Sequence, residues 1–328
     1  MHYHFSIQVL IPDIGRVQPS GSWQISSTVP DGLAVVPYIA MSDLLLLFPH
    51  DHVSTVVWDL ENDRRAGLLE GHDCFVTLAA VPECGSIAAT YSYVGDVAKI
   101  WSLDTMQCKA TLTSAGIASM CCLKDRLFLG SREGPIKVWD ISVSTPVALL
   151  DLQGHEDAVW NICASETHNV VLSGSNDESM RLWDVRTGGC VRTMRGHTGE
   201  VKSVDMDSAC RTGVSGSCDK TVKTWDLGTG KCIDTFHHER AVRSVGLHET
   251  GSSFFSLDAD NCLNLFATAD AGKRENKTVD LKAVCGLSAQ YAFTMRVAAN
   301  KDLSCIATSY INDSTTNGNR LVTSMMWQ

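Results

Sequence analysis

The sequence predicts an all-β chain built from seven copies of a four-stranded antiparallel sheet. Three observations lead to this fold class: an aromatic-centred pattern that recurs at a nearly constant spacing, short runs in which apolar and polar residues alternate, and turn-forming residues between those runs. Alternation with a period of two is the mark of a strand with one buried face. Short strands separated by tight turns pair as antiparallel neighbours, so each copy of the pattern predicts one small sheet.

The recurring pattern ends, in each copy, on an aromatic anchor. The first five anchors lie 43, 38, 44 and 42 residues apart, a further 41 residues reaches a phenylalanine, and 61 more reaches a tryptophan. Seven anchors at this period predict seven sheets in one folded domain, residues 1–328. The anchors are Trp58, Trp101, Trp139, Trp183, Trp225, Phe266 and Trp327.

The clearest copies lie between Gly154 and Phe236 and show how one sheet is encoded. Residues 170–173 and 180–183 alternate as strands do, while residues 176–178 and 187–189 supply turn-forming side chains. A sheet of this size cannot bury both faces by itself. We therefore expect the sheets to stack and to protect one another's edges.

The two ends of the chain predict how the last sheet is completed. The sequence stops at Gln328, directly after the third strand expected for the seventh copy, so its outer strand is missing. Residues 5–11 alternate and precede the first copy, and we predict that they supply this closing strand. Residues 267–289 exceed the repeat length and are predicted to form a surface insertion.

The Gly-His and Trp-Asp pairs, such as Gly154-His155 and Trp183-Asp184, resemble those of the WD40 repeat family of seven-bladed β-propellers. The resemblance covers nearly the whole chain. It implies a hydrogen-bonded relay in each blade, in which an Asp holds a His, the His reaches a Ser, and the Ser reaches a Trp indole. The two complete sets are His155, Ser173, Asp177 and Trp183, and His197, Ser215, Asp219 and Trp225.

The blade after these two departs from the family pattern at its anchor. It keeps His238, Ser256 and Asp260 but ends in Phe266. Because phenylalanine has no N–H group to donate, we expect a truncated relay in this blade.

The earlier blades depart further. His72 and Trp101 are present with a displaced acid, Asp96, and the third blade offers Glu133 before Trp139 but no Gly-His pair. The registers of blades one, two, three and seven therefore stay open.

The resemblance also implies a partner-binding face. In WD40 relatives, partners often dock where the first strand of each blade begins and where the turn before the relay Asp emerges. Tryptophan and arginine dominate the binding energy of interface centres, which makes such positions candidate hot spots. The residues of this chain at these positions are Arg132, Trp160, Asn176, Lys202, Cys218, Arg243 and Arg296.

Two features of this sequence resemble ubiquitin-ligase receptors. In receptors of the F-box/WD40 type, arginines at the positions of Arg132, Lys202 and Arg243 bind phosphorylated peptides. Residues 171–186, which end in Trp-Asp-x-Arg, resemble the box of WD40 substrate receptors of a cullin-RING ligase, where Asp184 and Arg186 would contact the adaptor.

Composition limits the other function classes. A formal charge of −10 disfavours bulk binding of nucleic acid and leaves only local, salt-sensitive contacts. Thirteen cysteines without the spacing of a disulfide framework or a zinc site predict a reducing compartment, cytoplasmic or nuclear, and no metal. No apolar stretch is long enough to cross a bilayer.

The sequence therefore predicts a monomeric propeller that binds proteins or peptides, acidic or phosphorylated ones among them, within a hetero-complex, without a cofactor and without catalysis. A cullin-RING substrate receptor is the alternative within binding functions. A propeller enzyme and a component of an RNA-processing particle are the alternatives of another class. An enzyme would need clustered carboxylates, histidines or a cofactor motif on inner loops, and the sequence has none.

Overall fold

The computed structural model of the chain describes residues 3–8, 27–29, 38, 40–42, 44–50, 53–62, 64–82, 86–165, 167–267, 275–280, 292–299 and 306–312. Every regular element in these ranges is a β-strand, and the strands form seven antiparallel sheets of four, as the alternation predicts. The chain divides into two compact units, Ser114–Val279 and Met1–Thr113 with Asp280–Gln328. The assignment of residues 1–328 to one domain stays a prediction.

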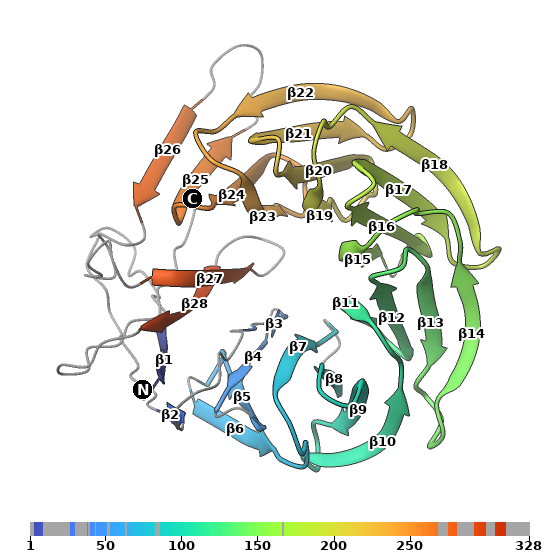
Figure 1. Cartoon of the computed structure of the whole chain (residues 1–328), viewed down its shortest axis with the longest axis vertical. Coiled ribbons are helices and arrows are strands. Elements are labelled where there is room, and N and C mark those ends of the chain that lie inside the picture. Colours follow the sequence, from blue (N-terminus) through green and yellow to red (C-terminus); the bar gives the residue numbers. More distant parts are fainter. Residues whose placement is uncertain are drawn as a thin grey trace. The chain divides into compact units, whose positions relative to one another are not determined.

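The unit Ser114–Val279 contains four sheets whose strands follow one another in sequence order (Figure 1). The first is β11 (Ile117–Leu123), β12 (Arg126–Ser131), β13 (Ile136–Asp140) and β14 (Val147–Leu152). The second is β15 (Val159–Ser165), β16 (Val170–Ser175), β17 (Ser179–Asp184) and β18 (Gly189–Arg195). The third is β19 (Val201–Met206), β20 (Thr212–Ser217), β21 (Thr221–Asp226) and β22 (Lys231–His237). The fourth is β23 (Val242–Leu247), β24 (Ser253–Asp258), β25 (Cys262–Ala267) and β26 (Glu275–Asp280).

The other unit contains three sheets. One is β3 (Ala40–Met41), β4 (Leu45–Pro49), β5 (Thr55–Asp59) and β6 (Arg64–Leu69). The next is β7 (Val76–Ala80), β8 (Ile87–Ser92), β9 (Val97–Ser102) and β10 (Gln107–Thr113). The third joins both ends of the chain in the order β27 (Ala292–Ala299), β28 (Ile306–Asn312), β1 (Tyr3–Gln8) and β2 (Ser27–Val29).

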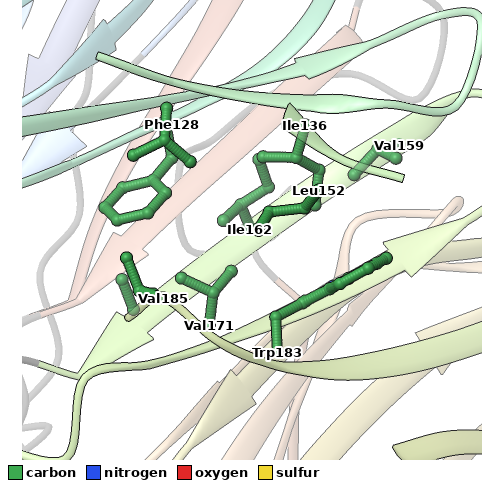
Figure 2. Packing of buried hydrophobic residues seen from close by; sticks show 10 residues of the cluster. Phe128, Ile136, Leu152, Val159, Ile162, Val171, Trp183 and Val185 are labelled. Carbon is green, nitrogen blue, oxygen red and sulfur yellow. The ribbon is translucent and has the colours of Figure 1, made fainter. Parts of the chain in front are cut away.

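The sheets of the unit Ser114–Val279 are held together by apolar side chains between their faces. Phe128 and Leu152 of one sheet pack with Val159, Val171 and Trp183 of the next in a single buried cluster (Figure 2). A sheet of four short strands gains little stability alone, and burial of such side chains contributes about 25 cal/mol for each Å² of apolar surface. The stacking of neighbouring sheets is therefore what builds the core.

Neighbouring sheets approach closely at glycines of the second strands. A Cβ atom added at Gly174 would lie 2.7 Å from Val201 Cγ1 of the next sheet, and one at Gly216 would lie 2.6 Å from Val242 Cγ1. Both distances are too short for a real side chain. The Ser-Gly-Ser sequence of these strands thus combines a relay serine with a glycine that allows close packing.

The first strands of successive sheets also exchange polar contacts. Ser119 Oγ of β11 donates to the carbonyl of Val159 in β15 at 2.7 Å. The amide of Leu247 in β23 donates to Asp205 Oδ2 of β19 at 2.8 Å. These contacts satisfy backbone groups at the edges of β15 and β23, which would otherwise be open for pairing.

The N-terminal segment pairs with the last sheet, as the fold prediction requires, but in a different position. Ile7 of β1 lies opposite Ser309 of β28, so β1 is the third strand of the sheet and β2 is the outer one. The expectation that the N-terminal segment would be the outer strand is wrong because it contributes two strands instead of one. Trp327 and residues 9–11 lie outside the described residues.

The prediction that residues 267–289 form a surface insertion is wrong for part of that range. Within it, β26 (Glu275–Asp280) is the fourth strand of the sheet that begins with β23. The repeat spacing misled because β26 begins at Glu275, after β25 has ended at Ala267, a wider separation than that between β21, which ends at Asp226, and β22, which begins at Lys231.

Candidate partner-binding site

The relay side chains of the sheet β15–β18 lie together at one end of the sheet. His155 Nδ1 lies 2.7 Å from Asp177 Oδ2, and His155 Nε2 lies 2.7 Å from Ser173 Oγ. Trp183 Nε1 donates to the same Ser173 Oγ at 2.8 Å. The four polar groups are thus bonded in series, and the buried indole N–H is satisfied.

The next sheet repeats this geometry. His197 contacts Asp219 and Ser215 at 2.7 Å each, and Trp225 Nε1 donates to Ser215 Oγ at 2.8 Å. Burial opposes the charged form of Asp219, but hydrogen bonds from Thr221 and His197 outweigh it and hold the pKa of this carboxyl below its usual value. The charged acid therefore fixes the turn between β20 and β21.

The relay of the sheet β7–β10 uses a threonine and has no acid. Thr90 Oγ1 lies 2.8 Å from His72 Nε2 and accepts from Trp101 Nε1 at 2.7 Å. Asp96 accepts instead from the hydroxyl of Tyr91 at 2.6 Å. Burial, with a smaller contribution from Lys99, lowers the pKa of His72 to about 4, so this imidazole is neutral near pH 7.

The sheet β23–β26 breaks the relay in a way that the sequence pattern did not show. Asp260 pairs with Arg240 at 2.8 Å, and the amide of Asn264 lies 3.3 Å from His238 Nδ1. Ser256 Oγ is 3.2 Å from His238 Nε2. The expectation that Asp260 holds His238 is wrong, because a neighbouring guanidinium binds the carboxylate.

The candidate binding residues of the first strands share one backbone feature. Trp160, Lys202 and Arg243 each occupy the extra position of a β-bulge, between Val159 and Asn161, Val201 and Ser203, and Val242 and Ser244. A bulge residue has no cross-strand partner and interrupts the alternation of faces. Because of the bulge, these three side chains are not part of the regular packing between strands and are available to contact a partner.

The candidate residues of the turns share a second feature. The amides of Arg132, Asn176 and Cys218 donate to carbonyls at the start of the first strand of their own sheets, at 2.7, 2.9 and 2.9 Å. The carbonyls belong to Gly116, Ala158 and Glu200. These hydrogen bonds hold each turn residue beside the bulge of its sheet, at the same end as the relay.

Three of the candidates are in direct contact. The Trp160 indole N–H donates to the side-chain oxygen of Asn176, and the Lys202 ammonium lies 4.0 Å from the centre of the Trp160 ring. Lys202 also forms an ion pair with Glu200, which the sequence analysis missed. The available signal for Glu200 was its opposite charge two positions before Lys202 in the sequence.

The remaining candidates differ in setting. Arg132 and Arg243 are exposed, and burial raises the pKa of the half-buried Cys218 thiol, whose sulfur lies 3.7 Å from Glu200 Oε2. Arg296 lies on β27 opposite Ser309, in the other unit, and its side chain is outside the described part of the chain.

Asp184 and Arg186 form a local pair on the surface. Asp184 Oδ1 accepts from the Arg186 amide at 2.8 Å, and Asp184 Oδ2 lies 3.0 Å from Arg186 Nη2. Hydrogen bonding to Arg186 lowers the pKa of Asp184. Asp140 and Asp226 likewise accept amides of their turns, so this Asp closes the turn after the third strand whether or not an arginine follows.

Two negative findings concern the described residues alone. Within the described ranges, no three His, Cys, Asp or Glu side chains are grouped as a metal site requires. The same ranges contain no helix with the length and apolar character that a bilayer span needs.

Comparisons with known proteins agree with this architecture. The family model "WD domain, G-beta repeat" matches residues 146–184 and 188–226. Nuclear distribution protein PAC1 of Arthroderma benhamiae is 27% identical over 266 residues, which cover 70% of this chain and 48% of that protein. The CCR4-associated factor 4 homolog of Candida glabrata is 27% identical over 139 residues, 38% of this chain and 24% of that protein. The chain thus spans half or less of these relatives.

A solved structure shows the same fold. A chain in the crystal structure of the mitotic checkpoint complex superposes with a TM-score of 0.72 at 18% identity, covering 86% of this chain and 90% of that chain. The likeness at this identity concerns the fold alone. Together with the repeats, it defines the class: the chain carries WD repeats in residues 146–184 and 188–226 and has a β-propeller fold. Its described residues form seven four-stranded sheets, and the N-terminal strand β1 pairs with β28 in the last of them.

Proposed function

We propose that the chain is a non-catalytic scaffold that docks a protein or peptide partner at the bulged ends of its first strands. The observation that carries the proposal is the placement of Trp160, Lys202 and Arg243 at the bulges of three successive sheets. WD40 propellers serve in general as platforms for protein interaction, and this geometry supports Trp160, Lys202 and Arg243 as the residues that would do so here.

Preorganisation of Trp160 supports the proposal. Its indole N–H is bound by Asn176 and one ring face is covered by the Lys202 ammonium, so the side chain is half-buried and already ordered before a partner arrives. A rigid aromatic loses little conformational entropy on binding and provides a large contact area. Trp160 is therefore the proposed anchor of the interface.

The serine, histidine and acid side chains of the relays support a structural role over a catalytic one. Ser173 and Ser215 are fully buried, and each already bonds a histidine and an indole. A nucleophile needs access to a substrate, which these hydroxyls lack. WD40 propellers are in general non-catalytic, and we propose the same for this chain.

The proposed setting is a hetero-complex in the cytoplasm or nucleus, with the propeller present as a monomer and without a cofactor. The thirteen cysteines of the sequence lack the spacing of a disulfide framework, which suits a reducing compartment. The similar chain of known structure also belongs to a complex, the mitotic checkpoint complex.

A second candidate function, substrate receptor of a cullin-RING ligase, rests on Arg186. Its side chain is 70% exposed, yet Asp184 holds it in one orientation through two hydrogen bonds. A held, exposed guanidinium is ready to bind an adaptor without further ordering. If this function is correct, a cullin adaptor should co-purify with the unmodified chain, and Arg186→Ala should abolish that co-purification. Absence of a cullin adaptor from the complex purified with the unmodified chain would exclude this function.

The docking proposal is tested by replacing both exposed arginines of the face. The double variant Arg132→Ala/Arg243→Ala, expressed with an affinity tag in the native cell, should lose at least one specific partner that the unmodified chain captures. Arg195→Ala, which removes an exposed arginine of the outer strand β18, is the matched control and should retain the partners. Identical partner sets for the double variant and the unmodified chain, with unchanged thermal midpoints, would rule out this face.

A further inference from the structure

One cation of the proposed face, Lys202, already forms an ion pair with an acid of the same chain, Glu200. Lys202 contacts the Trp160 ring on one side and the Glu200 carboxylate on another, and its side chain is 25% exposed against 43% for Glu200. Any acidic group of a partner that approaches Lys202 meets Glu200 first. An acidic group of a partner would therefore have to compete with Glu200 for Lys202.

Glu200 is the member of the pair that a partner can displace. Besides their contact with each other, Lys202 has the Trp160 ring as a second partner, and Glu200 has only the Cys218 thiol at 3.7 Å, which is a weak donor. Ion pairs at exposed positions contribute little to stability, so the exchange of Glu200 for another anion is energetically accessible. Cation–π contact keeps Lys202 in place during the exchange.

The chemistry of Glu200 decides which anion can replace it. A partner carboxylate offers Lys202 nothing that Glu200 does not offer, and Glu200 has the advantage of a tethered group with a high effective concentration. A phosphate carries about two negative charges and three acceptor oxygens, enough to bind Lys202 and a second cation together. Arg243 is exposed at the equivalent bulge of the next sheet and has no ion pair among the described residues.

We propose that Glu200 is an intramolecular competitor that sets the affinity threshold of this face, so that phosphorylated peptide segments displace it from Lys202 and singly charged carboxylates do not. The inference rests on the proposed docking function and deepens it by naming the partner chemistry. Glu200 then acts as a specificity-determining residue, since it lowers the affinity for every anion and leaves only the stronger ones able to bind.

The test is a titration of the full chain with three fluorescent peptides that differ at one central position: phosphoserine, glutamate or serine. In the unmodified chain we expect measurable binding of the phosphoserine peptide alone. Glu200→Gln should bind the phosphoserine peptide about two- to fivefold more tightly, the range expected for loss of an exposed ion-pair competitor. It should also bring the glutamate peptide into the measurable range.

A matched control separates competition from a general change of charge. Glu178→Gln removes the same charge from an exposed acid on the turn that carries Asn176, and we expect it to alter the affinities less than Glu200→Gln does. Adding Lys202→Met to Glu200→Gln should reduce the affinity for phosphoserine below that of the unmodified chain. Thermal midpoints of all variants check that they are folded.

Two results would overturn the inference: equal effects of Glu200→Gln and Glu178→Gln, or failure of Glu200→Gln to prefer the phosphoserine peptide over the serine peptide. Either result leaves the docking function intact if Arg132→Ala/Arg243→Ala still loses its native partner. If the docking proposal itself were wrong, the double variant Arg132→Ala/Arg243→Ala would capture the same partners as the unmodified chain.

Discussion

At the scale of single residues, one strand position decides whether an anchor tryptophan is satisfied. In β16 and β20 this position holds Ser173 and Ser215, whose hydroxyls accept the indole N–H. In β12 the register places Leu129 there, and the buried Trp139 Nε1 has no hydrogen-bond partner among the described residues. An unsatisfied buried donor costs about 1–3 kcal/mol, so the sheet β11–β14 retains Trp139 at a cost in stability.

This difference predicts that the same substitution, tryptophan to phenylalanine, costs more stability at Trp225 than at Trp139. Trp225→Phe removes an indole that donates to Ser215 and should destabilise the chain by about 1–3 kcal/mol. Trp139→Phe removes a donor that has no acceptor and should cost less, because the lost ring volume is partly offset by relief of the unpaired N–H. Urea unfolding of both variants measures the difference, and an equal loss at the two positions would contradict the hydrogen-bond explanation.

At the scale of elements, each first strand carries out two tasks at adjacent positions. Val201 and Val242 pack against the glycines of the preceding sheets, while the bulge residues Lys202 and Arg243 next to them leave the packed faces. A bulge makes this possible because one extra residue interrupts the alternation without ending the strand. In each of these strands one residue packs against the preceding sheet, and the residue after it is the one proposed to bind a partner.

The glycine contacts predict a stability effect that is specific to the joint between sheets. Gly216→Ala should destabilise the chain by about 1–3 kcal/mol, since its Cβ would overlap Val242 Cγ1. Gly189→Ala, where the nearest atom lies at 3.4 Å, is the matched control and should have a much smaller effect. Val242→Ala combined with Gly216→Ala should cost less than the sum of the two single changes in chemical denaturation. Simple additivity would show that the two sites are not in contact.

At the scale of the whole molecule, the sheet β27–β28–β1–β2 joins the two ends of the sequence. Backbone hydrogen bonding between β1 and β28 links residues 3–8 to residues 306–312. Such pairing protects the edge of β28, which would otherwise be available to another chain. It also makes the sheet dependent on the presence of both segments.

The register of this joint predicts which cysteine pair can form a bridge. In the backbone register Ile7 is paired with Ser309, whereas Ser6 is paired with Tyr310, and directly opposite positions are the ones close enough for a bridge. Under mild oxidation, Ile7→Cys/Ser309→Cys should form a disulfide that mass spectrometry maps to these two residues. Ser6→Cys/Ser309→Cys should not form one, and equal cross-linking of both pairs would refute the register.

Sequence patterns were sufficient for those parts of the fold that depend on local periodicity. Alternation, turn residues and the spacing of the anchors from Trp58 to Phe266 predicted four-stranded antiparallel sheets, because strand period and turn chemistry act between near neighbours. The fourth strand β26 escaped prediction because it begins at Glu275, farther along the sequence from β25 than the repeat spacing indicates. Asp260 was misassigned because its partner Arg240, twenty residues away, becomes a neighbour only in the folded sheet.

By itself the sequence determined the fold class, the family resemblance and the positions at which binding residues occur, since all three follow from repetition along the chain. Only the tertiary structure decided how those residues are used. It showed that Trp160, Lys202 and Arg243 are bulge residues and that Glu200 neutralises Lys202. The physical reason is that an ion pair or a bulge depends on distances between strands, and these distances exist only once the sheets have paired and packed.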